Sequence, residues 1–226
     1  MNLEYLTVSG NLGEVSQLRK NGYCLQTSSE LLADFCKGDS NSNLEGCYYV
    51  ANGVIVYPKD DSFFLAYTSG KNNLLLQPDH LDESLTKLPP NKFFRLDGTE
   101  ESWKIINDST TFRFNLSQLV SDRHNKCFSE NLPISNPRGY SRLNPEQQRF
   151  LQVVGYTPEN LEYLSRYNLN FLRVGIPNPK ELNTIFTGNN NTPIWSASWL
   201  EFFNTGSHFF ANCHCINYIR FLRGIK

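Results

Sequence analysis

Cysteine and histidine residues near the C-terminus are the first candidates for chemistry. Cys213, His214 and Cys215 are consecutive, and both residue types bind zinc. Three adjacent residues do not easily reach one tetrahedral ion, and the chain has no paired Cys-x-x-Cys knuckles. Cys47 or Cys127 could complete a site only through the fold. The sequence therefore predicts no metal and no cofactor.

A nucleophilic cysteine is the second chemical candidate. Cys47 follows Gly46, and His208 or His214 could act as its base. No local signature of a cysteine hydrolase surrounds Cys47. We therefore expect no catalytic residue, and keep a Cys/His-dependent hydrolase or a metal-dependent enzyme as the alternative. The segment 59–62 contains two aspartates but lacks the further ligands of a calcium loop, which favours a polar turn.

The charge composition of the chain disfavours some classes of binding partner. The 226 residues carry a net charge of −1, and charged residues make up 19%, which is below the usual quarter. This balance gives no basic field to attract nucleic acid. The N-terminus does not resemble a signal peptide, and no apolar run reaches the length that crosses a membrane. We expect a cytoplasmic protein whose six cysteines are free thiols.

The first half of the chain predicts short helices followed by strands. Apolar residues at helical spacing between positions 12 and 18 predict a helix that ends at Asn21-Gly22. Ser28 or Ser29 is the expected N-cap of a second helix. Asn52-Gly53 predicts a β-hairpin turn. Further strand-like runs occupy residues 63–68, 73–77 and two stretches between 93 and 114.

The second half predicts helices followed by strands. Asn144 and Thr157 are expected N-caps, each followed by proline at the first helical position. Another helical turn opens at Pro177. Strands are expected at 198–203, 208–213 and 218–222, with a turn at 204–206. The fold class is therefore predicted to be α+β.

Three motifs in this half carry a family resemblance. They are Ile176-Pro-Asn followed by Lys180-Glu-Leu, then Ile194-Trp-Ser-Ala-Ser-Trp, and finally Tyr218-Ile-Arg-Phe-Leu-Arg-Gly. Their order and spacing resemble a bacterial C-type-lectin-like family, which shares its fold with the formylglycine-generating-enzyme group. The active-site cysteine pair of those enzymes has no counterpart here, so their activity is not implied.

The resemblance implies a fold and a domain division. The expected fold is C-type-lectin-like, with short helices and a small twisted antiparallel sheet. Residues 111–226 would form this ligand-display domain, and residues 1–110 an accessory region of helices followed by β-hairpins. Trp195 would anchor the core, with Ile219 and Leu222 facing it, and Arg220 and Arg223 would pair with carboxylates or carbonyls.

Some proteins that share this fold are variable proteins of diversity-generating retroelements. In them, mutation at adenines diversifies residues near the C-terminus for ligand binding, and the accessible residue types exclude Lys, Glu, Gln, Met and Trp. Between residues 200 and 218 only Glu201 departs from that set. A protein ligand is therefore expected at an exposed patch of alternate residues, with Trp199 as a fixed neighbour. The expected ligand-binding residues are Trp199, Phe202, Asn204, Ser207, His208, Phe210, Asn212, His214, Ile216 and Tyr218.

Overall fold

The longest strand of the fold runs from Gly46 to Lys59. Its sequence is rich in valine, isoleucine and tyrosine, which favour extended backbone. The strand is buried on both faces along most of its length, as is typical of the centre of a sheet. The computed structural model describes residues 4–10, 14–37, 45–68, 94–95, 99–108, 110–119, 132–133, 143–166, 171–177, 179–187, 191–203, 206–211 and 220–226.

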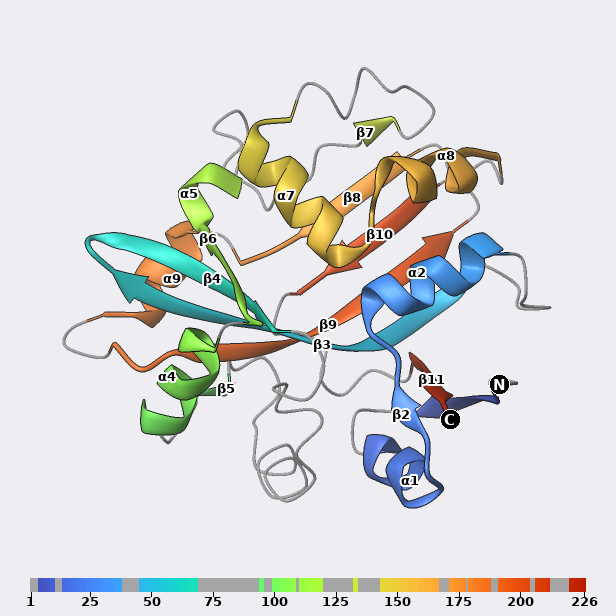
Figure 1. The fold of residues 1–226 in the computed structure, drawn as a ribbon. Helices are drawn as coiled ribbons and strands as arrows, with labels where there is room; N and C mark the ends of the chain where they lie inside the picture. Colours follow the sequence, from blue (N-terminus) through green and yellow to red (C-terminus); the bar gives the residue numbers. More distant parts are fainter. Residues whose placement is uncertain are drawn as a thin grey trace.

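The described residues form strands and helices in a mixed order along the chain (Figure 1). The strands are β1 (Tyr5–Gly10), β2 (Cys24–Leu25), β3 (Gly46–Lys59), β4 (Ser62–Thr68), β5 (Phe94–Arg95), β6 (Phe112–Asn115), β7 (Leu132–Pro133), β8 (Phe171–Gly175), β9 (Ile194–Phe203), β10 (Gly206–Phe210) and β11 (Arg220–Ile225). The helices are α1 (Val15–Lys20), α2 (Ser28–Lys37), α4 (Thr99–Asn107), α5 (Leu116–Leu119), α7 (Pro145–Val154), α8 (Pro158–Arg166) and α9 (Pro179–Ile185).

All described strands join one sheet with the central order β1-β11-β3-β9-β10-β8-β7. Most neighbours are antiparallel, but β10 pairs with β8 in parallel and β11 pairs with β3 in parallel. The sheet is therefore larger than the small antiparallel sheet expected from the sequence, and it is mixed. Its first strand and its last strand in the chain, β1 and β11, are neighbours, so both ends of the described chain lie together (Figure 1).

The hairpin predicted at Asn52-Gly53 is wrong, because β3 continues through this dipeptide. The register with β9 shifts between Val50 and Gly53, which marks a bulge or irregularity. Asn52 is buried there, and its side-chain oxygen accepts a hydrogen bond from the Ser28 backbone nitrogen at 2.6 Å. Its side-chain nitrogen donates to the Thr68 carbonyl at 3.2 Å. Contacts with distant segments thus replace the turn that the local sequence favours.

The hairpin that joins β3 to β4 turns at Asp60 and Asp61 instead. Both residues have positive φ, 50° and 57°, as a two-residue turn between antiparallel strands requires. Lys59 pairs with Ser62 across the turn. The predicted polar turn at 59–62 and the predicted strand at 63–68 are therefore confirmed.

Local capping signals predicted several helices well. α1 ends with Asn21 as its C-cap, followed by Gly22 at φ 82°. α7 begins with the expected Asn144 cap and Pro145, and Gln147 completes a capping box. The start of α2 differs by a residue from the prediction, because Thr27 and Glu30 exchange the capping hydrogen bonds. A helix-initiating signal is local in the sequence, which explains this agreement.

The stretch between residues 93 and 114 contains a helix where the sequence predicted strands. α4 occupies much of it, between the short strands β5 and β6. Ile105 and Ile106 are buried and Trp103 packs against the same cluster, so one face of this helix covers the sheet. The predicted strand at 73–77 lies outside the described residues.

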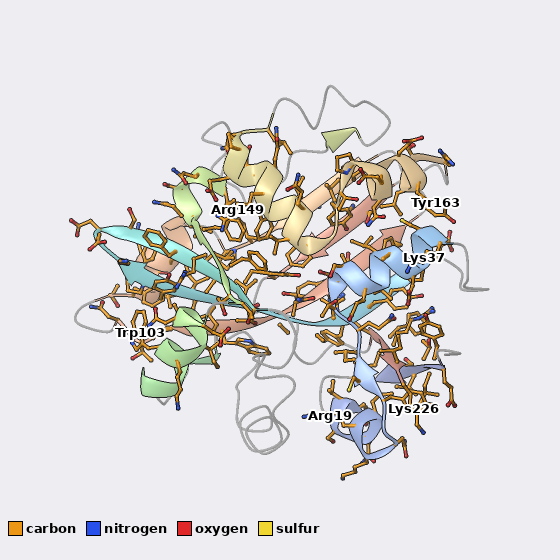
Figure 2. All side chains as sticks on the ribbon, in the orientation of Figure 1. Arg19, Lys37, Trp103, Arg149, Tyr163 and Lys226 are labelled. Atoms are coloured by element: carbon orange, nitrogen blue, oxygen red, sulfur yellow. The ribbon has the colours of Figure 1, made fainter. Side chains whose placement is uncertain are left out.

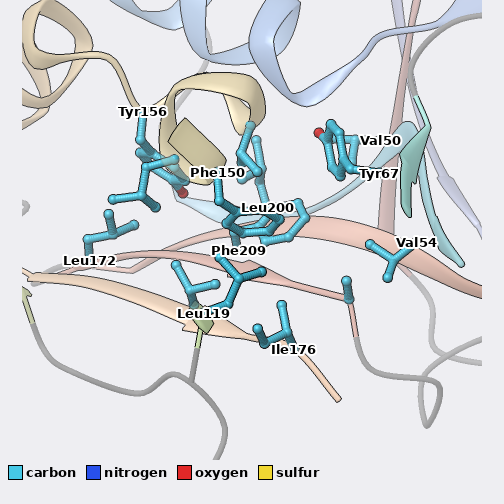
Figure 3. Close-up of a cluster of buried hydrophobic side chains, with 14 of the residues drawn as sticks. Val50, Val54, Tyr67, Leu119, Phe150, Tyr156, Leu172, Ile176, Leu200 and Phe209 are labelled. Atoms are coloured by element: carbon cyan, nitrogen blue, oxygen red, sulfur yellow. The ribbon is translucent and has the colours of Figure 1, made fainter. Parts of the chain in front are cut away.

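Two hydrophobic clusters lie on opposite faces of the sheet, and helices cover both faces (Figure 1). The first, which we call the upper core, receives side chains from α2, α5, α7, α8 and α9. Figure 3 shows part of it, with Phe150, Tyr156, Leu200 and Phe209 packed together. The second, the lower core, receives side chains from α1 and α4 and contains the expected anchor Trp195 and also Leu222. Ile219 lies outside the described residues.

The expected boundary at residue 110 does not separate two sheets or two cores. β3 and β4 precede this position, whereas β9 follows it and pairs with β3 along nine residue positions. The upper core also combines side chains from both parts of the chain. Among the described residues, no helix is long and apolar enough to cross a membrane.

Asn52→Ala should destabilise the protein by about 2 kcal/mol, because it leaves the buried Ser28 nitrogen and Thr68 carbonyl without their partner. The urea unfolding midpoint measures the change. Asn21→Ala, at an exposed position, is the matched control and should leave the midpoint unchanged. Equal midpoints for both variants would contradict the structural role of Asn52.

Candidate functional site

A row of polar side chains crosses the lower face of the sheet. In the register of the sheet, Glu201 on β9 lies opposite Cys47 of the neighbouring strand β3 on one side. On the other side it lies opposite His208 of the neighbouring strand β10. His208 in turn pairs with Arg173 on β8. Arg220 begins β11 beside Cys47, because the next residue of β11 pairs with the next residue of β3. Five strands thus place ionisable or thiol groups in one line, which we call the polar row.

Glu201 is the centre of the polar row. Its Oε1 accepts hydrogen bonds from Trp199 Nε1 and from Arg220, both at 2.9 Å. Its second oxygen, Oε2, lies 3.8 Å from His208 Nδ1. Both members of the Glu201–Arg220 pair are largely shielded from solvent, whereas the His208 side chain remains 21% exposed. One carboxylate therefore links residues from three strands.

The surroundings hold Glu201 in its ionised form. Burial alone would raise the pKa of Glu201, but the neighbouring His208, the hydrogen bonds from Arg220 and Trp199 and the charge of Arg220 outweigh it and lower the pKa to about 2. Burial also disfavours the charged form of Arg220 and would lower its pKa. The hydrogen bond and the charge of Glu201 nevertheless raise the pKa of Arg220. The pair is therefore ionised throughout the physiological range.

Aromatic rings complete the environment of Arg220. Its guanidinium lies 4.2 Å from the centre of the Trp199 ring and 5.4 Å from that of Tyr49. Such cation–π contacts stabilise a partly desolvated arginine. The expectation that Arg220 pairs with a carboxylate is confirmed, and the partner is Glu201.

Three of the predicted ligand-binding residues are buried, so their place in an exposed patch is wrong. They are Trp199, Phe202 and Ser207. Phe202 packs edge-on against Phe35 of α2, with ring centres 5.1 Å apart. The Ser207 hydroxyl lies 2.7 Å from the Tyr156 hydroxyl inside the upper core. Other parts of the protein cover both faces of the strands that carry these three residues, whereas the prediction assumed that one face was exposed to solvent.

The remaining predicted residues divide into two groups. His208 is partly exposed and belongs to the polar row, and Phe210 ends β10 opposite Trp199. Asn204, Asn212, His214, Ile216 and Tyr218 lie outside the described residues. The row also includes Glu201 and Arg173, which were not predicted to take part in the site. Glu201 did carry a signal, since it alone departs from the residue types expected between 200 and 218.

The structure fixes both ends of the segment 212–219. On the N-terminal side, the buried Ala211 donates its backbone N–H to the Gly175 carbonyl at 2.8 Å. On the C-terminal side, Arg220 is held by Glu201 and by the Trp199 ring. The two ends are thus attached to β8 and β9, which belong to the central sheet. Trp199 and Glu201 act here as framework.

Other places in the described structure were candidates for a metal site, a reactive thiol or a ligand groove. Within the described ranges, no group of three or more His, Cys, Asp and Glu side chains is arranged to hold a metal ion. Cys24 and Cys36 are free thiols, as expected. A groove of about 380 Å³ lies between α2 and α8, which carry Lys37 and Tyr163 (Figure 2). Burial raises the pKa of Cys36 in this groove to about 11, which makes the thiol unreactive.

The fold resembles a solved structure. No protein-family profile matches the sequence, and no curated protein has significant sequence similarity to it. The solved structure is described as showing how the C-type lectin fold accommodates massive sequence variation in Nanoarchaeota. The two chains superpose with a TM-score of 0.59 at 13% sequence identity, over 99% of this chain and 96% of the other. The protein therefore has the C-type lectin fold, as the C-terminal motifs predicted.

Glu201→Gln should destabilise the protein by about 3 kcal/mol, because it leaves the buried Arg220 charge without its counter-ion. Urea unfolding measures the change. Glu162→Gln removes the same group from the exposed pair with Arg166 and should have no measurable effect. A small loss in both variants would show that the Glu201–Arg220 pair does not hold the strands together.

Acid should remove the stability that Glu201 contributes. Because its pKa is lower in the folded protein than its ordinary value of 4.5, this contribution is complete above about pH 4.5 and is lost as the pH falls toward about 2. The difference in unfolding free energy between wild type and Glu201→Gln should therefore shrink across this window. A difference that stays constant between pH 6 and pH 2.5 would contradict the assignment.

Proposed function

We propose that this protein is a non-catalytic binding protein that presents the segment 212–218, together with His208 and Phe210, to a protein ligand. Asn204 at the β9–β10 connection belongs to the same proposed surface. Of these residues, His208 lies on the lower side of the sheet, in the exposed part of the polar row. We further propose that the protein acts in the cytoplasm and binds neither nucleic acid nor membranes, in accordance with its balanced charge.

The anchoring of both segment ends is the observation that carries this proposal. Ala211 is attached to β8, and Arg220 is attached to β9 through Glu201 and Trp199. These bonds use a backbone group and framework side chains, and none of them comes from residues 212–219. The segment can therefore change in sequence without loss of its attachment. Binding proteins use the same division between a rigid scaffold and adaptable contact residues.

The composition of the segment also supports binding. Its residues include Asn212, His214 and Tyr218, and aromatic, asparagine and histidine side chains give contact area and adaptable hydrogen bonds. The similar structure from Nanoarchaeota accommodates massive sequence variation. That likeness supports, for this chain, the finer proposal that a retroelement diversifies the C-terminal residues.

A cysteine hydrolase is less well supported. β9 lies between the strands that carry Cys47 and His208, and Glu201 occupies the position between these two residues. Strands two positions apart in a sheet are separated by about 10 Å, whereas a nucleophile and its base need hydrogen-bond reach. His208 Nδ1 is instead directed toward Glu201. Binding is therefore the function that the arrangement favours.

Combined randomisation of Asn212, His214, Ile216 and Tyr218 should leave most variants folded. The physical reason is that the anchors of the segment lie outside these four positions. Protease resistance of a surface-displayed library measures the folded fraction. A matched library at the buried positions Trp199, Leu200, Phe202 and Phe209 should be largely unfolded, because such substitutions create cavities or overpack the core.

Equal protease sensitivity of the two libraries would overturn the display proposal, because the segment would then be part of the core. The retroelement proposal has a separate test in the gene. A near-copy of the codons for residues 200–218 that differs only at adenines, beside a reverse transcriptase gene, is the expected finding. If no such template exists, diversification fails as a proposal while the binding function can stand.

A further inference from the structure

An arginine on the opposite face of β11, Arg223, has no counter-ion among the residues that the structure describes. Arg223 is 6% exposed, and its Nε is enclosed and makes no hydrogen bond. No ion pair joins Arg223 to an acidic residue within the part of the chain that the structure describes. The expectation that this arginine pairs with a carboxylate or carbonyl is thus not met by any described contact. Burying an uncompensated charge is costly, so an oxyanion that neutralised it would be stabilising.

Aromatic rings surround this guanidinium. Its central carbon lies 4.5 Å from the centre of the Tyr5 ring on β1 and 5.6 Å from that of Phe35 on α2. Burial raises the pKa of the Tyr48 hydroxyl, and the nearby positive charge of Arg223 partly opposes this rise. Tyr5 is half-buried on a strand at the border of the sheet (Figure 1), so its ring covers the arginine from the outside.

Gln26 provides a second buried polar group without a partner beside Arg223. The Gln26 backbone nitrogen donates to the Arg223 carbonyl at 3.1 Å, which places the two residues opposite each other. Gln26 Nε2 donates to the Asp34 carboxylate, and this contact fixes the orientation of the amide because a carboxylate only accepts. Gln26 Oε1 is therefore directed away from Asp34, and it is buried without a hydrogen bond.

A donor and an acceptor without partners, on neighbouring buried side chains, indicate a missing polar group. We propose that Arg223 and Gln26 bind an oxyanion, that is, a phosphate or carboxylate group, once the Tyr5 ring moves aside. The oxyanion neutralises Arg223. A hydroxyl on the same group, as in dihydrogen phosphate, donates to Gln26 Oε1. This site lies on the face of β11 opposite Arg220, and it does not depend on the proposed binding surface.

Thermal unfolding in inorganic phosphate tests this proposal. At pH 6 and constant ionic strength set with sodium chloride, 50 mM phosphate should raise the unfolding temperature of the wild type by about 5 °C for a dissociation constant of about 1 mM. Arg223→Met should lose most of this increase. Arg149→Met is the matched control. Arg149 (Figure 2) also stacks on a ring, at 4.7 Å from the centre of Phe114, but it has the carboxylate partner Glu146.

Two further variants separate the parts of the site. Tyr5→Ala uncovers the arginine, so the phosphate-dependent increase should be larger than in wild type. Gln26→Ala should keep the response to sulfate but lose the advantage of phosphate over sulfate, since sulfate at this pH carries no hydroxyl proton. An acetate series shows whether a carboxylate serves as well as a phosphate group.

The general stabilising effect of phosphate on proteins acts on every variant, so only differences between variants count. An equal increase in wild type, Arg223→Met and Arg149→Met would overturn the proposal, and an ordered water would then be the partner of the two buried groups. If Arg223→Met does not fold, phosphorus NMR of inorganic phosphate decides instead. Line broadening is expected with wild type and Tyr5→Ala, and its absence with both would also overturn the proposal.

Discussion

The irregularity in β3 between Val50 and Gly53 is the constraint on which the rest of the structure depends. Before it, β3 pairs with β11, and after it with β4, while β9 accompanies both halves. The chain that leads into α2 fills the irregularity, because Gln26 accepts from Ala51 and Ser28 donates to Asn52. A one-residue slip would turn Cys47 and Tyr49 to the opposite face. The polar row therefore exists only in this register.

Glu201 illustrates how the framework and the contact surface are divided. A charged residue in the middle of an aromatic strand pair is costly unless hydrogen bonds satisfy it, and here Trp199 and Arg220 donate them. The carboxylate thereby ties β9 to β11 from inside the sheet. A ligand at this face would meet His208 and its neighbours, with the Glu201–Arg220 pair beneath them. In the proposed function, the pair contributes position and the exposed residues contribute contact.

The sequence predicted the features that local chemistry determines. The Asn144-Pro145 helix start and the Asp60–Asp61 turn each depend on a few adjacent residues, and each has its expected place. Asn52-Gly53 failed because its side chain and backbone are used by segments far away in the chain. The exposure of Trp199 and Phe202 was wrong because alternation along a strand cannot reveal that helices and strands cover both faces. The sequence predicted that Arg220 would pair with a carboxylate or a carbonyl, but it did not identify Glu201, because Glu201 lies on another strand.

The two fixed ends of the segment 212–219 have a consequence for its length. When both ends of a connection are held by the framework, each doubling of its length costs only about 0.6 kcal/mol in closure entropy. The bonds at Ala211 and Arg220 do not depend on how many residues lie between them. If the segment is diversified as proposed, the physics of closure allows insertions and deletions there as well as substitutions.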